Sequence, residues 1–467
     1  MVPPGSLAFL LALGFAPDVL GFNLGAPALS GVGRWQWRAT RQSLQASPSS
    51  FFDDIPMGPP DGILGLSADF RACEAPHKVN LVVGAYRDSE GQPWVLPSVR
   101  EAEVRMGSAP AANKEYAPID GDAAFVKRAL AFAYGAASVP LVDQRLVGVQ
   151  TLSGTGACRI GGEFFARFLG KGTPIYVSDP TWGNHVGIMT EAGLEVRRYR
   201  YFERSSLGLD FEGMKADLLA APDGSVVLLH ACAHNPTGCD PTRAQWKELS
   251  NLLKGKKHHV FFDSAYQGFA SGDAAADAWA LREFVSDYEE QLQTNEEGGR
   301  FGSLLLAQSF AKNFGLYGER VGTLSVVCPT AQVAGTVLSQ LKLIIRPMYS
   351  SPPIHGAGIV KTVLGDEELS KQYIGECASM AARIQAMRLL LVSELKEAGS
   401  ALSWAHIAEQ IGMFAFTGMT QEMCDALMTD HAVYLTRDGR ISIAGINPGN
   451  VKYIAGAIHK VTSPSSP

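Results

Sequence analysis

The sequence predicts an α/β fold with a mainly parallel β-sheet, because short apolar runs alternate with longer stretches of helical pattern. The runs cover residues 226–229, 260–262, 304–307 and 323–327. They show no polar alternation, as is typical of strands that are buried on both faces of a parallel sheet. Residues 242–253 follow the first run, carry a polar face and predict a helix. Alternating strands and helices favour a layered α/β domain, whose ligands bind beyond the carboxyl ends of the strands.

Composition excludes several classes of protein. The chain has 467 residues, of which 46% are hydrophobic, and this excludes intrinsic disorder. At about 150 residues a domain, the length predicts two or three domains. The net charge of −6 argues against nucleic-acid binding, which requires a concentrated basic face. The seven cysteines are scattered and include no C-x-x-C pair, so they predict neither a disulfide framework nor a metal site.

Residues 1–50 differ in composition from the rest of the chain and predict a targeting presequence. They contain three arginines, one acidic residue and no lysine or glutamate. An apolar run at 7–16 is too short for a bilayer, which takes about 20 helical residues. Three interpretations remain open: a mitochondrial presequence, a signal peptide followed by a plastid transit peptide, and an extension with no targeting role. No later apolar run is long enough to cross a membrane, so we expect no span in the mature chain.

The first candidate binding motif lies where a strand-like segment, residues 147–152, meets a glycine- and hydroxyl-rich turn. The turn reads Ser153-Gly154-Thr155-Gly156 and precedes an apolar stripe with helical spacing. Free amides at the start of a helix bind anions, and the two hydroxyls add donors. A plain helix cap explains the same residues equally well. The pattern matches neither G-x-G-x-x-G nor a P-loop, so a nucleotide is not the expected anion.

Residues with catalytic chemistry follow two other runs. Asp263 closes the run at 260–262, and Tyr266 lies three residues later. A carboxylate there either caps the next helix or holds the proton of a pyridinium nitrogen. Lys312 follows the next run, and Arg320 lies eight residues beyond it. Such a lysine is either a solvated charge or a desolvated amine that forms a Schiff base.

Further segments complete the organisation. Residues 234–238 contain an Asn-Pro pair and predict a turn after the first run. The stretch 287–299 contains several acidic residues and two glycines, and it predicts a solvated surface loop. A helical pattern at 367–398 and a strand-like segment at 433–443 predict a second, smaller α/β unit.

Together, eight stretches of this sequence resemble the aspartate aminotransferase family of pyridoxal-phosphate enzymes. They follow the family's order and extend from about residue 51 to residue 461. The resemblance implies the pyridoxal-phosphate-dependent transferase fold (fold type I), with a large, mainly parallel-sheet domain and a smaller α/β domain. The matching stretches are VNLVVGAYRDSEGQPWVLP (79–97), EYAPIDG (115–121), SGTG (153–156), PTWGNH (180–185), HACAHNPTG (230–238), FDSAYQGFASG (262–272), QSFAKNFGLYGERVG (308–322) and residues 439–447.

The resemblance also implies domain boundaries. Residues 1–50 would form the presequence and 51–60 an N-terminal arm. The small domain would combine 61–93 with 380–467, and the large cofactor-binding domain would cover 94–379.

The implied cofactor is pyridoxal 5′-phosphate, and no metal is expected. Lys312 would form the Schiff base and shuttle a proton between the substrate's α-carbon and the cofactor. Asp263 would pair with the pyridine nitrogen, Tyr266 and Asn235 would hydrogen-bond the ring oxygen, and Trp182 would stack on the ring. The phosphate would be held by Ser153, Gly154, Thr155, Ser309 and Arg320, and by Tyr116 donated across a dimer.

The implied substrates are amino and oxo dicarboxylic acids. Arg440 would bind the α-carboxylate, and Arg346 would reach across a homodimer with shared active sites to bind the side-chain carboxylate. The implied reaction is a ping-pong transfer of the amino group between L-aspartate and 2-oxoglutarate, giving oxaloacetate and L-glutamate. An aminotransferase that prefers aromatic amino acids and a non-catalytic binding protein remain alternatives. The backbone around Gly84 and the ring of Phe414 would line the α-carboxylate end, and Trp182 and Asn235 would also bind the substrate.

Some positions depart from the family pattern or stay ambiguous. Ala311 precedes the lysine where a serine is possible, and the family's mitochondrial branch shares this alanine. That similarity favours the mitochondrial matrix, with the plastid as the alternative. Ser351 replaces a usual asparagine, which puts a substrate-side hydrogen bond in doubt. His185 and His230 are either core histidines or supports for the site.

Overall fold

The computed structural model of the chain describes residues 50–58, 64–82, 84–108, 114–294 and 300–463. The chain divides into two units, residues 1–59 and 60–467. In the first unit, the described residues contain the short helix η1 (Phe51–Asp54), which the Ser50 side chain caps. The presequence predicted for residues 1–50 lies outside the described residues except for Ser50.

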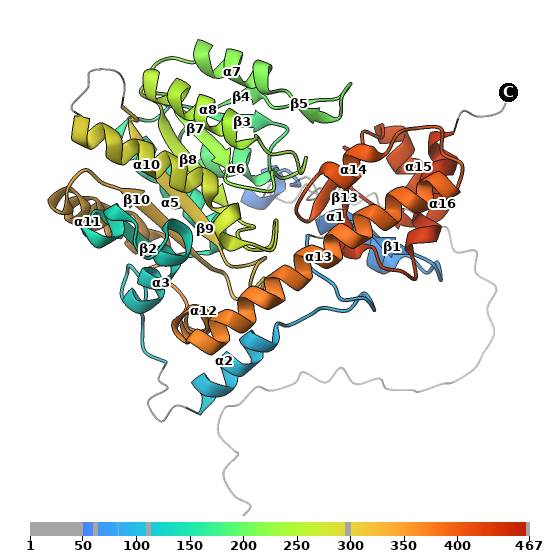
Figure 1. Ribbon diagram of the computed structural model, residues 1–467, viewed down its shortest axis with the longest axis horizontal. Coiled ribbons are helices and arrows are strands. Elements are labelled where there is room, and N and C mark those ends of the chain that lie inside the picture. The colour runs from blue at the N-terminus through green and yellow to red at the C-terminus, as the bar shows by residue number, and fades with distance from the viewer. Residues whose placement is uncertain (1–49, 59–63, 83, 109–113, 295–299, 464–467) are drawn as a thin grey trace, which may run out of the picture. The chain divides into compact units, whose positions relative to one another are not determined.

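The second unit is organised around a seven-stranded, mainly parallel sheet, which confirms the predicted fold class (Figure 1). Only β10 runs antiparallel to its neighbours, β2 and β9. The four predicted apolar runs all form strands of this sheet. The strands, in their order across it, are β2 (Leu146–Leu152), β10 (Val321–Val327), β9 (Ser303–Ser309), β8 (His259–Ser264), β7 (Val226–His230), β3 (Pro174–Asp179) and β4 (Glu195–Arg200).

The apolar runs lack polar alternation because both faces of the sheet are covered. In β7, Val227 and Leu229 belong to one hydrophobic core, whereas Val226 and Leu228 belong to the core on the opposite face. Side chains of a strand alternate between faces, so one apolar run supplies both cores. The first core includes residues of α3 (Ala123–Tyr134), α8 (Arg243–Gly255) and α10 (Trp279–Thr294); the second includes residues of α5 (Ser153–Phe168), α6 (Asn184–Glu191) and α11 (Ala331–Met348).

A second set of elements forms smaller sheets. β1 (Val79–Asn80) pairs with β12 (Val433–Tyr434) in parallel, and β11 (Phe414–Phe416) pairs with β13 (Arg440–Ser442) in antiparallel fashion. The predicted helix at 367–398 is α13 (Glu367–Glu397), whose N-terminus Asp366 caps. In Figure 1, α13 runs from α12 to α14 and α16. It continues through the predicted domain boundary at 379/380, and that boundary remains a prediction.

The other elements are helices and two short strands, which pair with each other as a further antiparallel sheet. They are α1 (Leu64–Ala72), α2 (Pro97–Gly107), α4 (Val139–Val142), β5 (Phe202–Glu203), β6 (Gly208–Leu209), α7 (Phe211–Ala220), α9 (Ala274–Asp277), α12 (His355–Gly365), α14 (Ala405–Glu409), α15 (Gln421–His431), η2 (Ile443–Gly445) and α16 (Val451–Thr462).

Two predicted elements differ in the structure. The acidic stretch 287–299 is not a loop over its first part, because α10 extends to Thr294; residues 295–299 lie outside the described residues. Tyr288 of this helix is buried in the core. Glu289 forms an ion pair with Arg145, and Asp287 forms one with Lys254, so these acidic residues belong to a packed helix. The strand-like segment 433–443 is two strands, β12 and β13, separated by a turn in which Gly439 has a φ of +88°.

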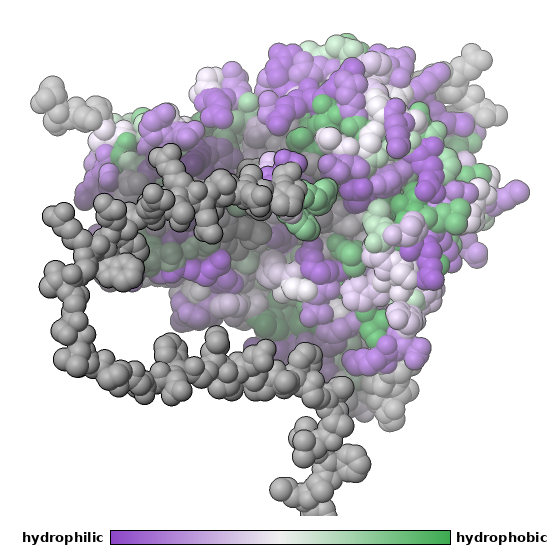
Figure 2. Space-filling model, turned by 180° about the vertical axis from the view of Figure 1, so that it is seen from behind, coloured by the Kyte–Doolittle hydropathy of each residue, from purple (hydrophilic) through white to green (hydrophobic). Residues whose placement is uncertain are grey.

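Among the described residues, none of the helices combines the length and apolar character needed to cross a bilayer. Figure 2 shows hydrophilic residues interspersed with hydrophobic ones over the described part of one face. Scattered apolar residues of this kind are normal on protein surfaces.

The packing of α5 on the sheet generates a prediction about stability. A Cβ at Gly161 would lie 2.4 Å from Cζ of Phe261, which is fully buried in β8. We expect Gly161→Ala to lower the free energy of unfolding by about 1–3 kcal/mol through overpacking, as measured by urea denaturation. Phe261→Leu in the same chain should recover part of this loss. Gly187→Ala is the matched control, because Gly187 lies on α6 with open space at its Cβ position. An equal loss in both glycine variants would contradict the packing argument.

Candidate functional site

A cavity of about 240 Å³ lies beyond the carboxyl ends of the parallel strands. The strand register brings these ends together, because His230 of β7 pairs with Asp263 of β8 and Asp263 pairs with Ala307 of β9. All the predicted site residues except Tyr116 and Arg346 line this cavity. They are Gly84, Ser153, Gly154, Thr155, Trp182, Asn235, Asp263, Tyr266, Ser309, Lys312, Arg320, Phe414 and Arg440.

The side-chain amine of Lys312 is part of the cavity lining. It follows β9, and its Nζ donates a hydrogen bond to the carbonyl oxygen of Gly84 at 2.7 Å. Burial, together with the positive charges of Arg440 and Arg320, lowers the pKa of Lys312 to about 8. A substantial fraction of the amine is therefore neutral near physiological pH, which is the form that acts as a nucleophile or base.

Asp263 ends β8 and is fixed by a chain of hydrogen bonds. Nε2 of His185 lies 3.2 Å from the Asp263 carboxylate, and Nδ1 of His185 lies 2.8 Å from the hydroxyl of Thr181. That hydroxyl is 3.4 Å from Nε2 of His230, whose Nδ1 accepts the backbone N–H of Asn235. One set of tautomers satisfies every link: both histidines carry their proton on Nε2, and the Thr181 hydroxyl donates to His185.

These hydrogen bonds decide between the two roles that the sequence left open for His185 and His230, namely core histidines or supports for the site. Burial lowers the pKa of His230 to about 3, with the nearby His185 acting in the same direction. His230 therefore remains neutral, as the acceptor role of its Nδ1 requires. Both histidines support Asp263 rather than merely filling the core. Sequence reasoning missed Thr181 as the link between them, although it lies within the quoted stretch 180–185.

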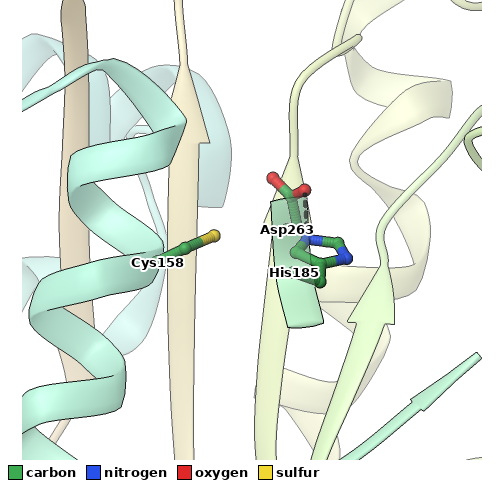
Figure 3. Close-up of side chains that lie close together, drawn as sticks. All are labelled: Cys158, His185 and Asp263. Carbon is green, nitrogen blue, oxygen red and sulfur yellow. Dashed lines mark hydrogen bonds and ion pairs between the residues drawn. The ribbon is translucent and has the colours of Figure 1, made fainter. Parts of the chain in front are cut away.

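Cys158 also points toward Asp263 and His185 (Figure 3). The potential ligand atoms of these three side chains lie within 4.8 Å of one another. Metal binding by cysteine requires the thiolate. Burial, together with the charge of Asp263, raises the pKa of the Cys158 thiol well above its usual value, which favours the protonated thiol.

One end of the cavity is built to hold an anion. The α5 helix begins at Ser153, and its N-cap residue, Leu152, forms no side-chain cap to the first amides. The hydroxyls of Ser153 and Ser309 lie 3.0 Å apart, and Arg320 is exposed at the rim. Ser153 (φ +60°) and Arg320 (φ +53°) both adopt left-handed backbone conformations, and the Ser153 N–H donates to the Arg320 carbonyl. Free helix amides, two hydroxyls and a guanidinium suit a phosphate group.

The opposite end contains a buried guanidinium. Arg440 is 5% exposed, donates from Nη2 to the carbonyl oxygen of Val82 and lies 4.2 Å from the ring centroid of Phe414. Its Nε is buried without a hydrogen-bond partner in the described part of the chain. A Cβ at Gly84 would come within 2.6 Å of the Phe414 ring, so glycine is needed for this close approach. Because this unpartnered donor belongs to a cation that lines the cavity, it indicates a site for an anionic ligand.

The aromatic predicted residues border the same cavity. Tyr266 is buried, and this burial raises the pKa of its hydroxyl. The Trp182 ring meets His185 edge to face, with centroids 5.1 Å apart. Sequence reasoning did not single out Cys232 and Ala265, which also line the cavity.

Tyr116 and Arg346 lie elsewhere. The Tyr116 side chain is 90% exposed, and Arg346 is an exposed residue of α11 that donates to the hydroxyl of Ser350. Neither lines the cavity of its own chain. Their predicted roles require a second copy of the chain and remain predictions.

The lowered pKa of Lys312 can be measured directly. We expect Lys312 in the cofactor-free chain to react with acetic anhydride with a midpoint near pH 8, because only the neutral amine reacts. Mass spectrometry of the peptide that contains residue 312 gives this midpoint. Arg440→Met should shift the midpoint upward, because it removes a cation that opposes protonation.

Lys215 is the internal reference for this measurement. Hydrogen bonds to Glu248 and Glu212 raise its pKa, so it should react only at higher pH. A Lys312 midpoint as high as that of Lys215 would contradict the environment described here.

Comparisons with known proteins agree with this geometry. Residues 76–458 match the model of the family described as aminotransferase class I and II. The chain is 49% identical to the mitochondrial aspartate aminotransferase of Dictyostelium discoideum, over 89% of this chain and 94% of that protein. A mitochondrial aspartate aminotransferase structure from Trypanosoma brucei is 42% identical and superposes with a TM-score of 0.80, covering 85% of this chain and 100% of that one.

A third relative is the aromatic-amino-acid aminotransferase of Burkholderia pseudomallei, solved covalently bound to pyridoxal phosphate. It is 38% identical, with a TM-score of 0.83, over 89% of this chain and 100% of that one. The resemblance expected from the sequence is thereby confirmed. The chain belongs to the class I and II aminotransferase family.

Proposed function

We propose that this chain catalyses the aspartate aminotransferase reaction with pyridoxal 5′-phosphate as its cofactor. At one end of the cavity, the start of α5 with Ser153, Ser309 and Arg320 forms a group that we call the anion cradle. The observation that carries the proposal is that Lys312, an amine of lowered pKa, lines the same cavity as this anion cradle and the buried guanidinium of Arg440. The identity to the Dictyostelium discoideum enzyme supports the substrate assignment.

The residues present fit the cofactor. The anion cradle suits its phosphate, and the Asp263 carboxylate, oriented by His185, suits a protonated ring nitrogen. Tyr266 and Asn235 would donate to the ring oxygen, and Trp182 would cover one ring face. When bound, pyridoxal 5′-phosphate supplies an aldehyde that combines with amines and a ring that stabilises negative charge at the substrate's α-carbon. The phosphate would be held by Ser153, Gly154, Thr155, Ser309 and Arg320.

Three residues of this chain then act in the reaction. Arg440 binds the substrate's α-carboxylate with its guanidinium, whose Nε is still unpartnered. The neutral Nζ of Lys312 accepts the proton from the α-carbon, and its pKa near 8 suits a group that both takes and returns protons. Asp263 keeps the proton of the ring nitrogen in place. Two half-reactions on one cavity give ping-pong transfer from L-aspartate to 2-oxoglutarate, forming oxaloacetate and L-glutamate.

The proposal extends to a homodimer with shared active sites. Arg346 would bind the side-chain carboxylate of a dicarboxylic substrate in the partner's cavity, and Tyr116 would bind the phosphate there. The exposure of Tyr116, and the absence of both residues from the described lining of their own cavity, support this arrangement. A single arginine can select dicarboxylic over neutral substrates, because an unpaired buried charge costs about 2–5 kcal/mol.

An aminotransferase that prefers aromatic amino acids is the alternative within the family. The Burkholderia pseudomallei relative shows that such an enzyme shares this fold at 38% identity. The identity to the Dictyostelium discoideum aspartate aminotransferase, 49%, is higher and favours the dicarboxylic assignment.

The proposed location is the mitochondrial matrix. The Dictyostelium discoideum relative is named as mitochondrial, and residues 1–50 are poor in acidic residues. A plastid location through a bipartite presequence is the alternative.

Lys312→Ala tests the reaction. We expect a loss of aspartate turnover of at least about 10²–10⁴-fold, because the α-carbon proton then has no positioned acceptor. In the wild type, borohydride reduction should fix the cofactor to the peptide containing residue 312, and mass spectrometry should find no such adduct in the variant. A wild type that binds the cofactor without this adduct would contradict the assignment.

Arg346→Ala tests the shared site. We expect aspartate kcat/KM to fall by about 30-fold to 10³-fold and phenylalanine kcat/KM to change little, since only aspartate presents a second carboxylate. Refolding a mixture of the Arg346→Ala and Lys312→Ala chains should restore about a quarter of the wild-type activity, because half of the dimers then contain one intact site. Failure of the mixture to recover activity, with dimers present, would contradict sharing.

A fusion of residues 1–50 to a fluorescent protein tests the location. We expect the fusion to import into mitochondria, because the segment combines spaced arginines with few acids. Microscopy with mitochondrial and plastid markers gives the answer in a plastid-containing cell. Plastid fluorescence would replace the first assignment with its alternative.

A further inference from the structure

Arg388 is a buried cation outside the cavity. It lies on α13, its side chain is fully buried, and it forms no ion pair with any carboxylate among the described residues. Burial lowers the pKa of Arg388 to about 9, still above neutral, so the guanidinium remains charged. Burying a charge without a counter-ion is unfavourable unless the group forms strong hydrogen bonds.

The hydrogen bonds of Arg388 all go to one stretch of backbone. Nη1 donates to the carbonyl oxygen of Ile407 at 2.9 Å, and Nη2 donates to those of Gly412, at 2.8 Å, and Phe414. We call residues 407–414 the clamped segment. A guanidinium can bind three carbonyls in one plane, which a neutral side chain of similar size cannot do.

The clamped segment forms a wall of the active site. At its end, the Phe414 ring lines the cavity, contacts the Arg440 guanidinium and leaves no room for a side chain at Gly84. Within it, the Ile411 N–H donates to the carbonyl of Gly238, in the turn that carries Asn235. The backbone that Arg388 holds therefore sets the position of the surface on which Arg440 rests.

We propose that Arg388 is a positioning residue, which holds Phe414 and thereby orients Arg440 toward the substrate's α-carboxylate. The inference rests on the proposed function, because it assigns that carboxylate to Arg440. A positioning role differs from a purely structural role in one respect. Losing Arg388 should weaken substrate binding and raise KM, while the chemistry at Lys312, and therefore kcat, stays nearly unchanged.

The experiment compares Arg388→Met, Arg388→Lys and Arg282→Met in the cofactor-loaded enzyme. Arg282 is the matched control, because its guanidinium also donates to two backbone carbonyls, those of Phe132 and Ala133, but neither of these two residues lines the cavity. For Arg388→Met we expect KM to rise about tenfold for aspartate and phenylalanine alike, since both present an α-carboxylate, with kcat within about twofold. Arg388→Lys should restore part of the affinity. Arg282→Met should leave both KM values unchanged.

Hydrogen exchange gives a second readout that does not depend on turnover. Two amides report on the clamped segment: that of Ile411, which donates to Gly238, and that of Phe416, which donates to the Gln410 side chain. We expect both to exchange faster in Arg388→Met than in the wild type, and to be unaffected in Arg282→Met. If Arg388→Met does not fold, Arg388→Lys decides, with an expected rise in KM of about threefold. Lower thermal stability with unchanged KM and unchanged exchange at these amides would overturn the proposal. A wild type without aspartate turnover would overturn the proposed function, while the exchange comparison would still decide whether Arg388 holds the segment.

Discussion

The concentration of positive charge in one cavity is the constraint on which the site depends. Lys312, Arg320 and Arg440 face a cavity in which Asp263 is the only acidic residue among the described residues of the lining. Burial is the main cause of the lowered pKa of Lys312, and repulsion by the two neighbouring cations acts in the same direction; the same excess of positive charge favours anionic ligands. A phosphate at one end and a carboxylate at the other would neutralise the excess. The amine between them then does not need a general base of its own to become reactive.

The fold provides this cavity by aligning strand ends. β7, β8 and β9 run parallel, and their register places His230, Asp263 and the turn that leads to Lys312 at one edge. The anion cradle comes from the next layer, because α5 begins at that same edge. Arg440 comes from a separate small sheet, β11 with β13, and reaches the cavity only because the chain returns there after α13. The site thus combines residues that are far apart in sequence.

The sequence predicted the central sheet well, because strands buried on both faces leave uninterrupted apolar runs. The prediction of a surface loop at 287–299 was wrong over the residues of α10, because it relied on the many acidic residues there. Tyr288 and Leu292, four residues apart, pack against the core, and this spacing identifies a helix. The two histidines could not be assigned from sequence, because their role depends on a hydroxyl, that of Thr181, which lies between them only after folding. For Tyr116 and Arg346, a single chain does not contain the partners that their roles need. Nothing in the sequence indicated the role of Arg388, because the sequence does not show whether an arginine on a helix is buried or exposed to solvent.

The unbroken course of α13 has a mechanical consequence. At 1.5 Å per residue, its 31 residues span about 46 Å, with no proline to introduce a kink. It therefore acts as a stiff lever between α12, beside the large sheet, and α14 and α16 near the small sheets. A rotation of about 5° at one end displaces the other by about 4 Å, which follows from this length. A shift in packing beside the large sheet would thus be amplified at the small sheet that carries Phe414 and Arg440.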